Sequence, residues 1–199
     1  MAVAQLWTVR RHVTMTLKLL PILGFIWFVS ELCLTRRSGP GAMSKDQGSL
    51  RVLWLVEMVS IGCGILAAYH FRAGGLPERH LFYVLGVCVF AMGLVLRLYS
   101  IIYLGRFFTI NVAIATDHRL IDSGPYRLVR HPSYTGALML FFGLGLGIGN
   151  WLSLVVIIVP VFAAFWWRMG IEEAALLEAL GEPYRCYMKR TKRLIPMIY

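Results

Sequence analysis

Five apolar stretches divide this chain, and their lengths constrain its fold more than any other feature. They cover residues 17–34, 52–71, 81–104, 136–149 and 151–167. The first three are long enough to cross a hydrocarbon core about 30 Å thick, because each residue of a helix adds about 1.5 Å. Only Asn150 separates the last two, so we expect a helical hairpin that enters the membrane and returns.

Composition favours an all-α integral membrane protein over a soluble one. Hydrophobic residues make up 58% of the 199-residue chain, more than an ordinary soluble domain of this length contains. We therefore predict a helical bundle of about five transmembrane helices that forms a single domain, residues 1–199. Three membrane helices should occupy residues 1–104, and most of the side chains suited to chemistry follow in residues 105–199.

The segment after residue 167 is too polar to remain in lipid. Four glutamates between residues 172 and 182 alternate with Ala and Leu, which is typical of an amphipathic helix. Gly181 and Pro183 should interrupt this helix. Beyond them, Tyr184 and Tyr187 share a face while basic residues occupy other faces, and this pattern predicts a cytoplasmic helix at the level of the lipid headgroups.

The basic residues indicate which end of the bundle faces the cytoplasm. If the tail is cytoplasmic, fourteen Lys and Arg residues lie in inner segments and five in outer ones. Because cytoplasmic loops are enriched in Lys and Arg, we expect the loop 105–135 and the tail 168–199 to lie on that face. The net charge of +10 then reflects contact with anionic lipids. Nucleic-acid binding is not expected, since the basic residues lie between apolar stretches.

Two further features have simple structural interpretations. Gly143, Gly145, Gly147 and Gly149 alternate with apolar residues, but no βαβ unit surrounds them as a nucleotide-binding loop would require. They predict close packing of membrane helices. The four cysteines form no C-x-x-C pair, and three lie in apolar stretches. They predict small core residues rather than disulfides or metal ligands.

A cluster of polar and aromatic side chains lies between the third and fourth apolar stretches. It contains His118, Tyr126, Arg130, His131 and Tyr134. A single aromatic residue at a membrane boundary usually anchors the protein in the interface, but so many ionisable groups together favour a functional site. Pro132 suits the first turn of the helix that follows, and the free N–H groups of such a turn can bind an anion.

Arg168 and Glu172 follow the last apolar stretch at a spacing of i, i+4, so they share one helix face. In one interpretation they form a local ion pair of little energetic value at an exposed site. In the other they point into a cavity, where Arg168 meets an anionic group of a substrate and Glu172 meets the ammonium of a ligand. The local sequence leaves both interpretations open.

Six motifs follow one another between residues 118 and 196. They are His118-Arg-Leu-Ile, Ser123-Gly-Pro-Tyr126, Arg130-His-Pro-Ser-Tyr134-x-Gly136, Arg168-x-x-x-Glu172-Glu173, Gly181-Glu-x-Tyr184 and Thr191-x-Arg193-Leu-Ile-Pro196. Together they resemble the isoprenylcysteine carboxyl methyltransferase family. The resemblance covers residues 105–199, whereas the first hundred residues match only as generic membrane helices.

The resemblance implies a membrane enzyme that uses S-adenosyl-L-methionine to methylate a lipophilic acceptor, above all the carboxylate of an isoprenylcysteine. It implies that Arg168 meets this carboxylate and that Glu172 holds the ammonium of the cofactor. It places further residues around the cofactor: His118, Arg119, Leu120, Ile121, Tyr126, His131, Pro132, Ser133 and Tyr134. The chain resembles the shorter members of the family, in which a prenylated protein substrate is not assured.

Three alternatives remain open. The acceptor could be another lipid, such as a phenolic or pyrone-type lipid, and a phenol would need a base to remove its proton. Membrane sterol reductases share a related Arg-His-Pro-x-Tyr region, although they are built on more spans. A non-enzymatic membrane protein could bind a lipid or a partner through its basic tail. Arg97 and Glu57 lie within predicted spans and could pair with each other or with a polar lipid group, snorkel, or line a cavity.

Overall fold

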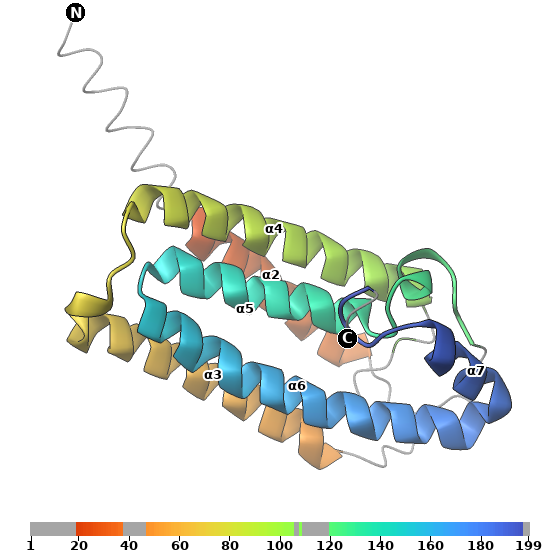
Figure 1. Cartoon of the computed structure of the whole chain (residues 1–199). Helices are drawn as coiled ribbons and strands as arrows, with labels where there is room; N and C mark the ends of the chain where they lie inside the picture. Colours follow the sequence, from red (N-terminus) through yellow and green to blue (C-terminus); the bar gives the residue numbers. More distant parts are fainter. Residues whose placement is uncertain (1–18, 38–46, 106–107, 109–119, 197–199) are drawn as a thin grey trace, which may run out of the picture.

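The computed structural model describes residues 19–37, 47–105, 108 and 120–196. Its elements are α2 (Leu19–Arg37), α3 (Gln47–His70), η1 (Arg72–Gly74), α4 (Arg79–Leu104), η3 (Gly124–Arg127), α5 (Pro132–Ile148), α6 (Trp151–Leu180) and α7 (Glu182–Arg190). Helices α2 to α6 lie alongside one another, and α7 lies at one end of this bundle (Figure 1). The predicted all-α bundle is confirmed.

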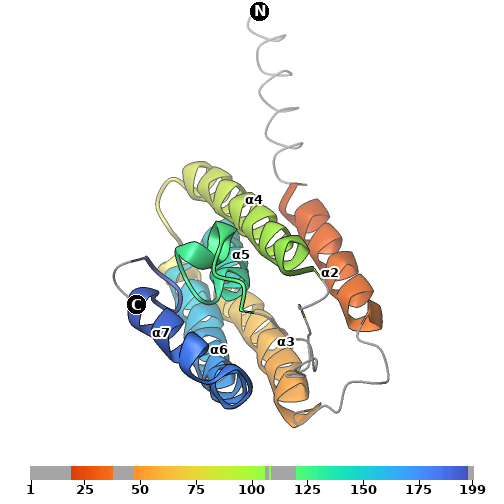
Figure 2. The same cartoon turned by 90° about the vertical axis from the view of Figure 1, so that its right-hand side faces the viewer.

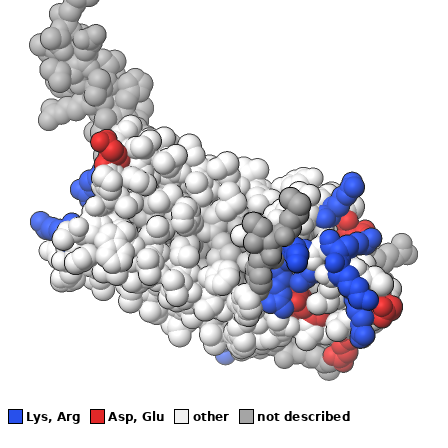
Figure 3. Space-filling view, in the orientation of Figure 1, with Lys and Arg blue, Asp and Glu red and all other residues white. Residues whose placement is uncertain are grey.

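The helices of the bundle are suited to lipid. Three are long and apolar enough to cross a membrane: Gly48–His70, Arg79–Leu104 and Trp151–Leu180. The apolar part of α2, Leu19–Leu34, and helix α5 are shorter. In the view of Figure 3, charged side chains gather at the ends of the molecule and leave its middle uncharged. The chain is therefore an integral membrane protein, and the expected five crossings stay a prediction.

Glycines let α4 and α5 approach until their backbones touch. A Cβ atom on Gly93 would lie 2.6 Å from the carbonyl oxygen of Gly136, and one on Gly86 would lie 2.6 Å from that of Gly143. Such contacts need residues without side chains. The packing role predicted for Gly143 is confirmed, while Gly149 instead ends α5 with a φ of +75°.

Helix α3 packs mainly against α6, as α4 packs against α5. Figure 2 looks along the bundle and shows these two pairs, with α2 at the side of α4. Gly64 makes the α3–α6 contact close, because a Cβ atom there would lie 2.6 Å from Cγ1 of the fully buried Ile157. The bundle thus consists of two tight pairs and a more loosely attached α2.

Asn150 forms the tip of the predicted hairpin between α5 and α6. Its side-chain oxygen accepts hydrogen bonds from the N–H groups of Leu152, at 3.0 Å, and Ser153, at 3.3 Å. This caps the first turn of α6, where N–H groups otherwise lack partners. The Asn150 amide also donates to the carbonyl of Phe71, at 2.7 Å. The hairpin prediction is confirmed, and its tip is tied to the end of α3.

Helix α6 differs from the prediction in one respect. The amphipathic segment is no separate element, because α6 continues without a break to Leu180. It ends where predicted, at Gly181, which has a φ of +60°.

Tyr184 and Tyr187 of α7 are buried against the protein, and the Tyr187 hydroxyl donates to the carbonyl of Tyr126, at 2.6 Å. The shared face of these two tyrosines therefore packs against the protein, and the position of α7 at the level of the lipid headgroups stays a prediction.

Arg97 lies inside the bundle and is paired, but not with Glu57. Its guanidinium donates to both carboxylate oxygens of Glu31 on α2, at 2.5 and 2.9 Å. It also donates to the carbonyl of Ser133, at 3.3 Å, and Trp27 adds a hydrogen bond to Glu31, at 3.1 Å. A buried charge needs such partners, and no pattern in the sequence indicates that α2 supplies them.

The cysteines do not occupy the core. All four are free and exposed at the surface of the folded chain, so the prediction that they are small core residues was wrong. Three of them lie on the helices α2, α3 and α4. In a membrane protein an apolar stretch has an outer face that is equally apolar, because that face meets lipid. Hydrophobicity of the surrounding sequence therefore does not separate core from surface here.

Candidate active site

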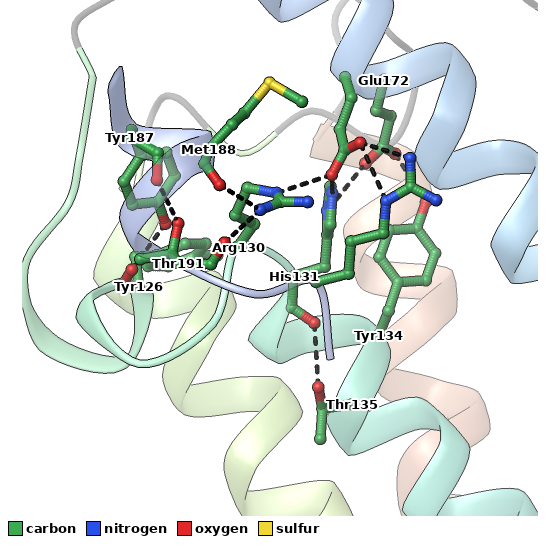
Figure 4. A network of polar contacts seen from close by, with 11 residues as sticks. Tyr126, Arg130, His131, Tyr134, Thr135, Glu172, Tyr187, Met188 and Thr191 are labelled. Atoms are coloured by element: carbon green, nitrogen blue, oxygen red, sulfur yellow. Dashed lines mark hydrogen bonds and ion pairs between the residues drawn. The ribbon is translucent and has the colours of Figure 1, made fainter. Parts of the chain in front are cut away.

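A network of polar side chains lies at the end of the bundle that carries α7. It joins the start of α5, the middle of α6 and the tail that follows α7 (Figure 4). The sequence clusters around Arg130 to Tyr134 and around Arg168 to Glu172 are thus brought together. The structure confirms their proximity, which the sequence could only suggest.

The tail is held against the segment before α5 by backbone hydrogen bonds. The N–H group of Arg130 donates to the carbonyl of Lys192, at 2.8 Å, and that of His131 to the carbonyl of Arg193, at 3.0 Å. The Thr135 hydroxyl adds a bond to the carbonyl of Leu194, at 2.9 Å. This arrangement fixes the backbone of His131 directly before the first turn of α5.

Glu173 is the centre of the charge network. Its carboxylate accepts hydrogen bonds from Arg130 Nε, at 2.8 Å, and from Arg193 Nη2, at 2.6 Å. The same carboxylate lies 3.2 Å from His131 Nε2. Arg130 also donates to the carbonyls of Met188 and Thr191. Glu173 is buried, so it joins α5, α6 and the tail from inside the fold. Sequence reasoning gave this residue no role.

His131 lies between two neighbouring carboxylates of α6. Its Nε2 faces Glu173, and its Nδ1 lies 3.7 Å from Oε2 of Glu172. Its ring meets the ring of Tyr134 edge to face, with centroids 5.7 Å apart. Since Glu173 also binds two arginines, the imidazole is held in one orientation.

Arg168, Tyr134 and Glu172 form the second part of the network. The Tyr134 hydroxyl donates to Glu172, at 2.6 Å, and accepts from Arg168 Nε, at 3.1 Å. Arg168 Nε lies 3.6 Å from Glu172, and another guanidinium nitrogen binds the hydroxyl of Ser49 on α3. Only 2% of the Arg168 side chain is exposed, against 22% of the Glu172 side chain. Glu172 is therefore the member that a ligand from outside can reach.

The two interpretations of Arg168 and Glu172 both describe part of this geometry. The residues do form an i, i+4 ion pair, but it is not an exposed one. Arg168 is almost fully buried, and its partners include Ser49 from α3, Tyr134 from α5 and Glu172 from its own helix. Ser49 is a contributor that sequence reasoning missed, since an isolated serine near a span has no distinctive pattern.

Tyr126 is buried and joins the network through its carbonyl, which accepts a hydrogen bond from the Tyr187 hydroxyl. Its hydroxyl donates to the carbonyl of Ser100 on α4, at 3.2 Å, and burial raises its pKa above the usual value. Burial likewise raises the pKa of Tyr187 to about 12. Both phenols therefore stay protonated and act as hydrogen-bond donors at neutral pH.

The remaining sequence-predicted residues lie around the same end of the bundle. Pro132 and Ser133 are buried at the start of α5, while Leu120 and Ile121 are half-buried in the segment before η3. His118 and Arg119 lie outside the described residues.

Comparison with known proteins identifies the family. The family model described as "Phospholipid methyltransferase" matches residues 81–183, just over half of the chain. The chain belongs to the phospholipid methyltransferase family. This matched segment contains almost all of α4, the whole of α5 and α6, and the residues Tyr134, Arg168 and Glu172.

Individual relatives within this family have more specific names. The protein-S-isoprenylcysteine O-methyltransferase B of Arabidopsis thaliana is 31% identical over 126 residues, 62% of this chain and 64% of the relative. The protein-S-isoprenylcysteine O-methyltransferase of Schizosaccharomyces pombe is 33% identical over 109 residues, 54% of this chain and 46% of the relative. The resemblance drawn from the motifs is thereby confirmed.

A solved structure shows the same fold. The eukaryotic intramembrane Ras methyltransferase, an isoprenylcysteine carboxyl methyltransferase, superposes with a TM-score of 0.63 at 30% identity. The superposition covers 73% of this chain and 52% of that protein. The chain thus spans about half to two thirds of the length of these relatives.

Proposed function

We propose that this chain is an S-adenosyl-L-methionine-dependent methyltransferase that methylates the carboxylate of an isoprenylcysteine-like lipid. The observation that carries the proposal is the arrangement of Glu172, Tyr134 and Arg168, a partly exposed carboxylate beside a buried guanidinium at one end of a membrane bundle. The names of the relatives support the same reaction.

The side chains around Glu172 fit the cofactor. Its carboxylate is the complement of an ammonium group, and the aromatic rings of Tyr134 and His131 beside it suit a ligand with positive charge. The first turn of α5, at Pro132, offers backbone N–H groups to a carboxylate. By the family resemblance, Tyr126, Ser133 and the segment His118, Arg119, Leu120 and Ile121 complete the cofactor site.

The bound cofactor would supply an electrophilic methyl group, which an oxygen nucleophile attacks in line. The protein then has to place the acceptor oxygen opposite the leaving sulfur, and positioning supplies most of the rate enhancement in such reactions. A carboxylate is already ionised at neutral pH and needs no base. We assign Arg168 to orient it, since Ser49 and Tyr134 fix this guanidinium in place.

The reaction is proposed to take place at the boundary between membrane and cytosol. A water-soluble cofactor would reach Glu172 from the cytoplasmic side, where the basic tail lies by the positive-inside rule. A lipid tail would enter between the helices. Lys and Arg side chains cluster at the end of the bundle that carries α7 (Figure 3), which supports this orientation.

The first test is cofactor binding by calorimetry on detergent-purified protein. We expect the wild type to bind S-adenosyl-L-methionine and the Glu172→Gln variant to lose most of the affinity, because the amide cannot pair with an ammonium. Glu182→Gln is the matched control, since Glu182 is exposed and contacts Arg185, at 3.6 Å, and Cys186, at 3.7 Å, both within α7. Equal affinity of Glu172→Gln and wild type would refute the assignment of Glu172. No binding by folded wild type would refute the methyltransferase function.

A second test follows the methyl group. Radiolabelled cofactor should transfer its label to N-acetyl-S-farnesylcysteine in the presence of the wild-type protein. Arg168→Lys should reduce this transfer, because a lysine lacks the planar guanidinium that contacts both Ser49 and Tyr134. Transfer at the wild-type rate by Arg168→Lys would show that another group orients the acceptor.

A further inference from the structure

Two buried polar side chains on α3 lack partners in the described part of the chain. Glu57 is 7% exposed and Ser60 is 4% exposed, and neither makes a hydrogen bond or an ion pair with a described residue. They are three positions apart and therefore neighbours on the helix surface. Ser49, which binds Arg168, lies on the same buried face of α3, eight residues before Glu57.

Glu57 differs in this respect from the other buried carboxylates. Glu31 is paired with Arg97 and Trp27, and Glu173 with two arginines and a histidine. A buried polar group without a hydrogen bond destabilises a fold, and a carboxyl group does so strongly. Two such groups side by side inside a membrane bundle therefore indicate a site that a polar ligand group completes.

The surroundings of Glu57 connect it to the candidate active site. Ser49, on the same buried face of α3, binds the guanidinium of Arg168. Arg97 donates to the carbonyl of Ser133, directly before Tyr134, and Arg168 donates to the Tyr134 hydroxyl. Glu57 therefore shares a buried face of α3 with a residue that contacts the candidate active site, about two helical turns away.

We propose that Glu57, with Ser60 beside it, accepts a hydrogen bond from an N–H group of the lipid acceptor. This inference rests on the proposed function, because it takes Arg168 as the group that orients the acceptor carboxylate. An acceptor that meets both residues presents its carboxylate to Arg168 and a hydrogen-bond donor to Glu57, along one face of α3. An amino acid or the end of a peptide has an N–H on the atom next to the carbon that bears the carboxylate.

The proposal predicts that the enzyme distinguishes between lipid acceptors that all have a carboxylate. An amino-acid headgroup satisfies both Arg168 and Glu57. A simple isoprenoid acid satisfies only Arg168 and leaves Glu57 buried without a partner, which disfavours its binding. The side chains on α3 would thus select for an amino-acid-like headgroup on the lipid.

Two acceptors that differ mainly in this N–H group test the proposal. They are N-acetyl-S-farnesylcysteine, which has an amide N–H, and S-farnesylthiopropionic acid, which has none. We expect the wild type to prefer the first. In Glu57→Leu the ratio of the two kcat/KM values should fall about tenfold, mainly through the KM of the first acceptor. Glu57→Gln keeps an accepting oxygen and should restore most of the preference.

Thermal unfolding without cofactor or lipid provides a readout that does not depend on activity. Glu57→Leu should raise the melting temperature, because it removes a buried carboxyl group that has no partner. Glu31→Leu is the matched control and should lower it, because it leaves Arg97 unpaired. A melting temperature lowered by Glu57→Leu would show that Glu57 is structural and would overturn the proposal.

The kinetic and binding outcomes separate this proposal from the function on which it rests. If the wild type methylates both acceptors and Glu57→Leu leaves their ratio unchanged, the proposal fails and the function stands. If the wild type methylates neither, the function fails, and stabilisation by added lipid still tests Glu57. In that case N-acetyl-S-farnesylcysteine should raise the melting temperature of the wild type more than that of Glu57→Leu, and equal shifts would overturn the proposal.

Discussion

The hydroxyl of Tyr134 donates a 2.6 Å hydrogen bond to the carboxylate of Glu172, and the same oxygen accepts from Arg168 at 3.1 Å. One phenol therefore connects the residue proposed for the cofactor with the residue proposed for the acceptor. It also keeps the guanidinium from pairing more closely with the carboxylate, which lies 3.6 Å away. The proposed roles of the two residues require such a separation, because each is assigned to a different ligand.

Removing the Tyr134 hydroxyl should weaken cofactor binding. In Tyr134→Phe the Glu172 carboxylate loses its 2.6 Å hydrogen bond and can turn toward Arg168. A hydrogen bond to a charged group contributes about 1.5 kcal/mol, so we expect the dissociation constant of S-adenosyl-L-methionine to rise about tenfold. Calorimetry measures this change, and circular dichroism checks that the fold persists. An unchanged dissociation constant would show that Glu172 is oriented by other groups.

Glu173→Gln should destabilise the end of the bundle. The substitution leaves Arg130 and Arg193 without the carboxylate that both contact, and breaking a buried ion pair costs about 3 kcal/mol. Unfolding in mixed detergent micelles measures the loss. Glu182→Gln is the control and should change stability by less than about 0.5 kcal/mol, because the Glu182 side chain is exposed. Equal stability of the two variants would contradict a structural role of Glu173.

The Arg97 and Glu31 pair should show strong coupling in a double-mutant cycle. Arg97→Met and Glu31→Leu should each lower stability, because each leaves one buried charge without its partner. The double variant should be more stable than the sum of the single changes predicts, by about 2 kcal/mol. Unfolding in mixed micelles gives all three values. Additive effects would mean that the two residues act independently.

Gly136→Ala should force α4 and α5 apart. Its Cβ atom would lie 2.7 Å from the backbone nitrogen of Arg97 and from the carbonyl oxygen of Gly93, and backbone atoms cannot turn aside. We expect a loss of about 2 kcal/mol in unfolding free energy. Gly62→Ala on α3 meets nothing within 4 Å and should stabilise its helix by up to about 1 kcal/mol. A tolerated Gly136→Ala would show that these helices pack less rigidly than described.

Features that depend on neighbouring residues could be predicted from the sequence. Apolar stretches indicated the membrane helices, and Asn150 indicated the hairpin. Gly181 marked the end of α6, and the i, i+4 spacing placed Arg168 and Glu172 on one face. Each of these signals lies within a few residues of the feature that it predicts.

Features that depend on contacts between distant helices could not be predicted. Arg168 and Ser49 are 119 positions apart, and Arg97 and Glu31 are 66 apart. No local pattern indicates which charged residue of one span will meet which residue of another. The same reason explains why the burial of Tyr184 and Tyr187 was not predicted, since the Tyr187 hydroxyl meets the carbonyl of Tyr126, 61 positions away.

The pairing of Arg97 with Glu31 has a consequence for how the chain enters the bilayer. Helix α2 is synthesised before α4, so Glu31 reaches the membrane while its partner is still absent. An ionisable side chain without a partner makes insertion of a single helix less favourable. If α2 crosses the membrane as predicted, we expect its insertion to be linked to that of α4, because its stable placement requires the opposite charge that the later helix supplies.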